Sequence, residues 1–98
     1  MLEVYAREFV GIGTYLKKSG KEKNGFIRIE KHELQALLDR NAFDTSDNKL
    51  RFWKSMKWIA TEDRRVTKRM YDSGSHSYKP YVLMDADVMK TLEQAIKK

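Results

Sequence analysis

The apolar positions near the start of the chain recur every three or four residues, which predicts a helix over residues 4–18 with one apolar stripe. The stripe consists of Tyr5, Phe9, Ile12 and Leu16. Gly20 follows this helix as a stop signal. Asn24 and Gly25 then predict a turn, and the turn leads into a short β-type segment at residues 26–29.

Two more helices with a short polar connection between them are predicted next. The first covers about residues 31–40, with its leucines facing inward and Asn41 as its C-terminal cap. The second runs to about residue 58, and three residues qualify as its N-cap: Thr45, Ser46 and Asp47. Two short helices joined by a tight turn are typical of a helix-turn-helix.

The period of the pattern changes after these helices. Residues 64–72 and 78–84 alternate in character and flank turn residues at 73–77, which predicts a β-hairpin. Pro80 lacks an amide donor, so its strand is expected at an edge. A final helix follows, with Asp85 or Asp87 as its cap. Its inward face consists of Val88, Leu92 and Ile96.

This order of elements resembles the winged helix-turn-helix family, in which a short strand after the first helix pairs with the hairpin, or wing. The segment at residues 50–59 looks like the family's recognition helix running into its wing. The resemblance covers nearly all 98 residues and implies one α+β winged helix-turn-helix domain that binds DNA. The small size, basic wing and lack of a ligand domain are similar to accessory and regulatory proteins of plasmids and phages, including those that bind a conjugative origin of transfer.

The net charge of +6 is concentrated in the middle of the chain. Residues 47–84 hold nine Lys or Arg and four Asp or Glu, which gives +5, whereas residues 1–46 give +1 from eight and seven. Such a concentration favours a polyanionic partner, and we expect the Lys and Arg side chains of residues 49–79 to form one continuous positive face. The chain contains no apolar run long enough for a bilayer and no cysteine, so we expect a cytoplasmic protein without membrane contact, disulfides or thiolate metal sites.

The third predicted helix supplies one group of candidate DNA contacts. With Leu50 and Trp53 inward, its polar side chains are expected on the surface: Asn48, Lys49, Arg51, Lys54, Ser55 and Lys57. Asn48 suits an adenine edge and Arg51 a guanine, while the lysines suit phosphates. An ordinary solvated cationic face remains the alternative.

The hairpin supplies the second and stronger group. Its candidates are Arg64, Arg65, Lys68, Arg69, Ser75, His76 and Lys79. Three arginines exceed what protection of a sheet edge requires, and arginine suits phosphate and minor-groove contacts. Tyr71, Tyr78 and Tyr81 flank these cations, and we favour cross-strand pairing over stacking on unpaired bases as their role.

The sequence therefore predicts sequence-selective binding of double-stranded DNA without enzymatic activity, cofactor or metal. Phe52, Trp53 and Trp58 crowd one segment, and we expect one of them outside the core, where a homodimer interface would cover it. Dimers or tandem copies on repeats would supply the affinity that one small module lacks. A protein-interaction module and a single-stranded nucleic-acid binder are the alternatives.

Overall fold

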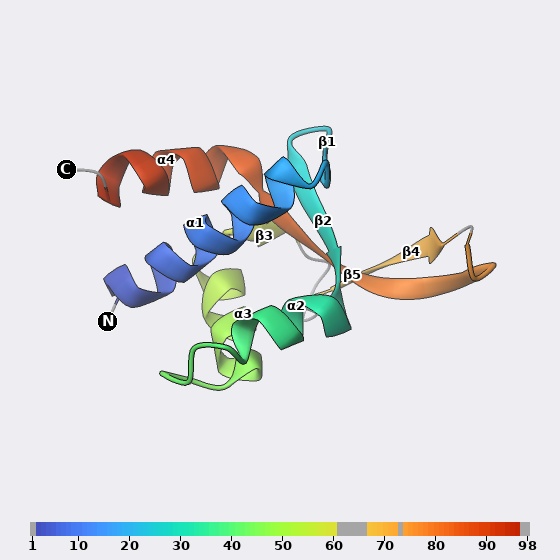
Figure 1. Ribbon diagram of the computed structural model, residues 1–98, viewed down its shortest axis with the longest axis horizontal. Helices are drawn as coiled ribbons and strands as arrows, with labels where there is room; N and C mark the ends of the chain where they lie inside the picture. Colours follow the sequence, from blue (N-terminus) through green and yellow to red (C-terminus); the bar gives the residue numbers. More distant parts are fainter. Residues whose placement is uncertain (1, 61–66, 73, 97–98) are drawn as a thin grey trace.

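Four helices and a curled antiparallel sheet make up the part of the chain that the structure describes (Figure 1). The computed structural model describes residues 2–60, 67–72 and 74–96. Its elements are α1 (Leu2–Lys18), β1 (Glu22–Lys23), β2 (Phe26–Glu30), α2 (Lys31–Leu38), α3 (Ser46–Ser55), β3 (Ile59–Ala60), β4 (Lys68–Asp72), β5 (Ser77–Asp85) and α4 (Ala86–Ile96). The predicted α+β class is thus confirmed, and two short strands, β1 and β3, are added to the prediction.

Strand β5 is the centre of the sheet, so the expectation of an edge strand is wrong, although Pro80 itself pairs only with β4. Its second half pairs with β2 and β3, and its first half pairs with β4. On one face of β2 and β5 the side chains are buried against the helices, and these are Ile27, Ile29, Val82 and Met84. The opposite face carries half-buried residues, which include Phe26, Arg28, Glu30 and Tyr81. The alternation of strand side chains therefore separates a core face from an outer face.

Side chains cap the helices where the chain leaves a strand or a turn. The carboxylate of Glu30 accepts hydrogen bonds from the first backbone amides of α2, the hydroxyl of Thr45 accepts one at the start of α3, and Asp85 does the same for α4. Thr45 is therefore the cap among the three predicted candidates. Asn24 and Gly25 form the two-residue turn between β1 and β2, with φ values of 55° and 81°.

Two helices end earlier than the sequence predicts. Helix α2 ends at Leu38 with Asp39 as its cap, so the predicted extension to residue 40 and the cap at Asn41 are wrong. Helix α3 ends at Ser55 instead of residue 58, because Lys57 turns the chain with a φ of 61°. The amide of Trp58 then donates to the carbonyl of Trp53 at 2.9 Å, and the amide of Lys57 to that of Lys54 at 3.0 Å. This pair of bonds is a Schellman motif.

The Schellman motif explains how the aromatic residues fit into one core. It directs Trp58 inward, where its ring lies 5.2 Å from that of Phe9, and Phe9 also meets Trp53 edge to face at 4.9 Å. Phe52 is half-buried between Tyr5 and Trp58. The expectation that one of the three aromatic residues at 52, 53 and 58 lies outside the core is therefore wrong. An exposed aromatic residue in this segment thus no longer supports a homodimer interface.

The two interior glycines of α1 predict opposite effects of the same substitution. A Cβ on Gly13 would lie 2.3 Å from the sulfur of Met89 on α4, whereas a Cβ on Gly11 would meet nothing within 4 Å. Gly11→Ala should raise the free energy of unfolding by up to about 1 kcal/mol through helix propensity. Gly13→Ala should lower it below the parent, because the buried side chain of Met89 must move from its place between α1 and α4. Urea unfolding of both variants checks this, and equal stabilisation by both would contradict the close packing.

The left-handed conformation of Lys57 predicts that glycine fits this position better. Lys57→Gly should raise the free energy of unfolding by about 1 kcal/mol, since glycine adopts a φ of 61° without the steric cost of a Cβ. The matched control, Lys54→Gly, lies within α3 and should lower stability by a similar amount. Thermal and urea unfolding measure both, and a loss of stability in Lys57→Gly would contradict the assignment of the motif.

Candidate nucleic-acid interface

Beyond the helices, β4 and the first part of β5 extend as a projecting hairpin, which we define as residues 68–81 (Figure 1). The longest extent of the molecule is 44 Å, compared with 26 Å and 25 Å in the other directions. Tyr71 and Tyr78 face each other across the two strands, with their rings edge to face at 5.5 Å. The predicted cross-strand pairing is therefore confirmed for Tyr71 and Tyr78, although both rings remain more than half exposed at 55% and 63%.

The tip of the projecting hairpin carries short polar side chains. The hydroxyl groups of Ser75 and Ser77 lie 2.8 Å apart, and the hydroxyl of Tyr71 lies 3.4 Å from Nδ1 of His76. His76 has a φ of 55°, which closes the turn into β5. All of these groups are exposed, so donors and acceptors cover the end of the hairpin.

The cations of the projecting hairpin are divided between its two faces. Arg69 lies opposite Pro80, on the same face as the tyrosine pair, and is exposed. Lys79 lies opposite Met70 on the other face and is half-buried. Lys68 begins β4 opposite Tyr81. Of the remaining predicted cations, Arg64 and Arg65 lie outside the described residues.

Helix α3 presents several of its predicted contacts to solvent. Arg51 is exposed and makes no side-chain hydrogen bond or ion pair within the described residues. Ser55 is exposed and donates to the carbonyl of Phe52 at 2.8 Å. Lys54 is half-buried, and Lys57 is exposed just beyond the end of the helix.

The side chain of Asn48 is held by Asp44. Its amide nitrogen donates to Oδ1 of Asp44 at 3.0 Å, while Oδ2 of the same carboxylate accepts from the hydroxyl of Tyr5 at 2.6 Å. These two hydrogen bonds and one from the backbone amide of Thr45 hold the pKa of Asp44 below its usual range. The same contact raises the pKa of Tyr5. Asn48 is therefore exposed but fixed in orientation at the start of α3.

Lys49 is buried, and its predicted place on the DNA-binding surface is wrong. Its Nζ lies 3.1 Å from Oε2 of Glu8 on α1, and it donates to the carbonyls of Leu38 at 2.6 Å and Asn41 at 2.5 Å. The ring of Phe43 lies 4.2 Å from the same nitrogen. The side chain is 0% exposed, so no phosphate reaches it.

The prediction for Lys49 was wrong because helical periodicity indicates on which side of the helix a side chain lies, but not which distant residues it contacts. Position 49 lies beside the inward positions Leu50 and Trp53, and all three are buried. The sequence shows no sign of Glu8 as its partner, because 41 positions separate the two residues.

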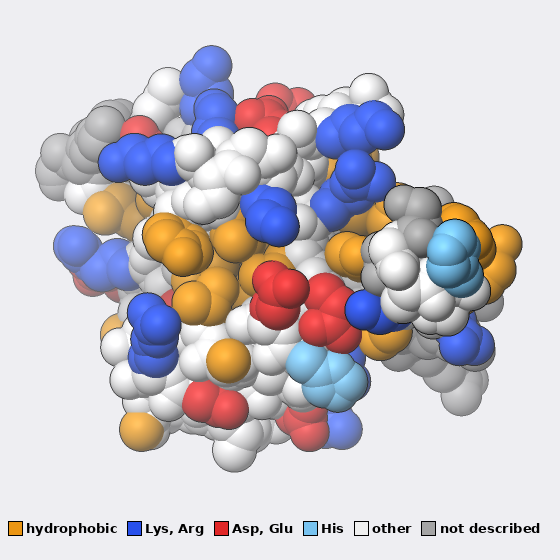
Figure 2. Space-filling model, turned by 45° about the vertical axis from the view of Figure 1, so that its right-hand side comes forward, with side chains coloured by type: hydrophobic (Ala, Val, Ile, Leu, Met, Phe, Trp, Pro, Cys, Tyr) orange, Lys and Arg blue, Asp and Glu red, His pale blue; other side chains and the backbone are white. Residues whose placement is uncertain are grey.

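A second cationic surface was missed by the sequence analysis. A cleft of about 390 Å³ lies between the projecting hairpin and the β1–β2 side of the sheet, and it is lined by Gly20, Lys21, Glu22, Lys23, Arg28, Met70, Tyr71 and Tyr81. We call it the β1–hairpin cleft. In the space-filling view, Lys and Arg side chains gather beside the gap that separates the body from the projecting hairpin (Figure 2). The charge count of residues 1–46 concealed this cluster, since acidic residues elsewhere in the segment nearly cancel it.

Within residues 2–60, 67–72 and 74–96 no group of three or more His, Asp or Glu side chains is placed to hold a metal ion. None of the helices in this part of the chain has the length and apolar character that a membrane crossing requires. No protein-family model and no curated protein matches the sequence.

The buried position of Lys49 predicts a structural role for this residue. Lys49→Met should lower the free energy of unfolding by about 3–5 kcal/mol, because it leaves Glu8 buried without its counter-ion. Arg51→Met, the exposed neighbour on the same helix, should change it by less than about 0.5 kcal/mol. Replacing both partners, with Glu8→Leu added to Lys49→Met, should recover only part of the loss, because the carbonyls of Leu38 and Asn41 still lack the ammonium donor. Urea unfolding compares the three, and equal stabilities of Lys49→Met and Arg51→Met would contradict the ion pair.

Proposed function

We propose that this protein binds double-stranded DNA as a winged helix-turn-helix module, with the projecting hairpin as its wing and main contact. The observation that carries the proposal is the hairpin itself, which extends beyond the core and exposes Arg69, polar tip side chains and a tyrosine pair (Figure 1). Tyr71 and Tyr78 are more than half exposed, so the hairpin buries little apolar surface of its own. Such a ribbon adds little to the stability of the fold, which favours a role in contacting a partner.

The dimensions of a two-stranded ribbon fit duplex DNA. The major groove is about 12 Å wide and admits either a helix or a two-stranded β-ribbon. A hairpin that enters by its tip brings Ser75 and His76 toward the base edges, while its two faces lie toward the two phosphate backbones. Arg69 on one face and Lys79 on the other suit this arrangement.

Helix α3 provides a second contact in this proposal. Arg51 is exposed, Lys54 is half-buried beside the inward positions, and Asn48 is held at the start of the helix. In helix-turn-helix docking the N-terminal part of this helix faces a groove, which suits Arg51 for a base edge and Lys54 for a phosphate. Two copies, bound as a dimer or side by side on repeats, would supply the specificity that one module lacks. Such a protein suits a regulatory or accessory role on plasmid or phage DNA.

Shortening the projecting hairpin tests the proposal directly. In this variant residues 71–78 are replaced by Asn-Gly, so that the pairing of β5 with β2 and β3 over residues 81–85 is untouched. We expect cooperative unfolding to persist, while affinity for random duplex DNA in a salt titration falls at least tenfold, or about 1.4 kcal/mol. Binding equal to that of the parent would overturn the proposal.

A single substitution with a matched control refines the test. Arg69→Ala should weaken duplex binding and reduce the slope of log affinity against log salt by the amount expected for one phosphate contact. Arg40 is an exposed arginine after α2, and Arg40→Ala should change neither quantity. If the parent fails to bind any duplex at low salt, the proposal is wrong, and a protein partner of the same surface takes its place. A preference for unpaired oligonucleotides over duplexes would instead favour single-strand binding.

A further inference from the structure

The β1–hairpin cleft has a strongly positive lining. Three of its side chains are cationic, namely Lys21, Lys23 and Arg28, and one is acidic, Glu22. Glu22 already lies 3.8 Å from Nζ of Lys17, which offsets its charge. Glu30, on the same outer face of the sheet, directs its carboxylate to the first backbone amides of α2 and to His32. The positive charge of the cleft is therefore largely uncompensated by these two carboxylates.

The cations of the cleft have no partner within the described residues. Neither the two lysines nor Arg28 makes a side-chain hydrogen bond or an ion pair there. Arg28 is half-buried in the middle of β2, and its guanidinium presents several N–H donors in a planar fork. A partly desolvated, unpaired guanidinium is costly, and a phosphate that accepts two of its N–H groups would satisfy it.

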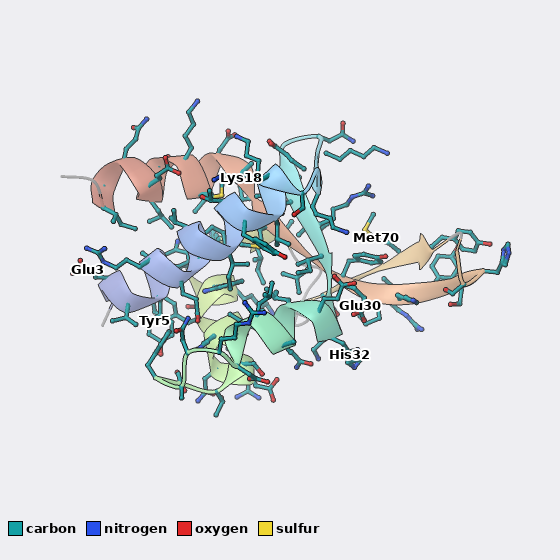
Figure 3. The ribbon with its side chains drawn as sticks, viewed as in Figure 1. Glu3, Tyr5, Lys18, Glu30, His32 and Met70 are labelled. Carbon is teal, nitrogen blue, oxygen red and sulfur yellow. The ribbon has the colours of Figure 1, made fainter. Side chains whose placement is uncertain are left out.

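One wall of the cleft comes from the projecting hairpin. Met70 points from β4 toward the β1–β2 side of the sheet, above the start of α2, where Glu30 and His32 lie (Figure 3). Tyr81 lies on the same outer face as Arg28. In the pairing of β2 with β5, Tyr81 lies opposite Glu30 and Arg28 lies opposite Leu83, and these positions alternate with the core positions of the two strands. The cleft therefore joins the base of the hairpin to three cations from a different part of the chain.

We propose that the β1–hairpin cleft binds the sugar-phosphate backbone of the same DNA duplex whose groove receives the projecting hairpin. This inference rests on the proposed function. A ribbon inserted in a groove has one phosphate backbone on each side, and the cleft lies at the base of the face that carries Met70 and Lys79. Lys21 and Lys23 neutralise phosphates as point charges, and the guanidinium of Arg28 orients one of them. Tyr81 and Met70 pack against the sugar edge.

The charge of the cleft can be removed without touching the core. Lys21 and Lys23 are exposed, so Lys21→Gln with Lys23→Gln leaves packing intact. The matched control is Arg40→Gln with Lys90→Gln, which removes the same charge from exposed positions after α2 and on α4. In the salt titration with random duplex DNA, the cleft variant should lose affinity about tenfold or more. Its slope of log affinity against log salt should fall by about 0.9 for each lost phosphate contact, and the control should retain the parental slope.

Arg28→Lys and Arg28→Gln then separate charge from geometry. The lysine variant should keep most of the salt dependence with reduced affinity, while glutamine should lose both. The losses should be uniform across DNA sequences, because backbone contacts carry no sequence information. If glutamine at position 28 disturbs folding, the exposed lysine pair still decides the question.

The outcomes distinguish this inference from the proposed function. If the parent binds duplex DNA and the hairpin variant does not, but the cleft variant matches the control, then the cleft proposal is overturned and the function stands. If the parent does not bind DNA, the function itself fails. A free phosphate ion could occupy the same cleft, so its binding is measured separately by calorimetry with inorganic phosphate alone. Binding of free phosphate that disappears in the cleft variant, without a change in DNA affinity, would make the cleft a small-anion site and overturn the proposal.

Discussion

The pairing of strand β5 is the constraint on which the rest of the structure depends. One continuous strand first serves as one side of the projecting hairpin and then forms the middle of the core sheet through Val82 and Met84. A shift of one residue in its pairing would move these side chains to the outer face and exchange the two faces of the hairpin. The burial of two core residues therefore fixes which face carries Arg69 and which carries Lys79.

The buried pair of Lys49 and Glu8 gives the helices a comparable constraint. Lys49 joins α1 to the end of α2 and to α3, because its three donors bind one carboxylate and two backbone carbonyls. Those carbonyls belong to the last residue of α2 and to the loop behind it, and the carbonyl of Leu38 also accepts from the backbone amide of Asn41 at 3.3 Å. A cation that resembled a DNA contact in the sequence is thus a structural cap.

Periodicity predicted the elements well, since apolar side chains at helical or alternating spacing are the part of the fold that the chain specifies locally. The short strand at β2, the Asn24-Gly25 turn and the hairpin follow from such local patterns. Helix ends were less predictable, because Lys57 takes the left-handed position in which a glycine is the usual signal. Lys49 and the β1–hairpin cleft depend on contacts between distant segments, and a count of charge along the chain contains no information on those.

A block of positive charge in the sequence need not become one positive surface. Strand alternation sends Arg69 and Lys79 to opposite faces, burial removes Lys49, and the cations of β1 and β2 join from outside the block. A single flat interface would reach the cations of only one face of the hairpin. A groove with phosphate on both walls uses both faces, so the division favours insertion of the hairpin over contact of one face with a flat partner. The placement of Lys21, Lys23 and Arg28 beside one of these faces extends the same argument from the hairpin to the body of the protein.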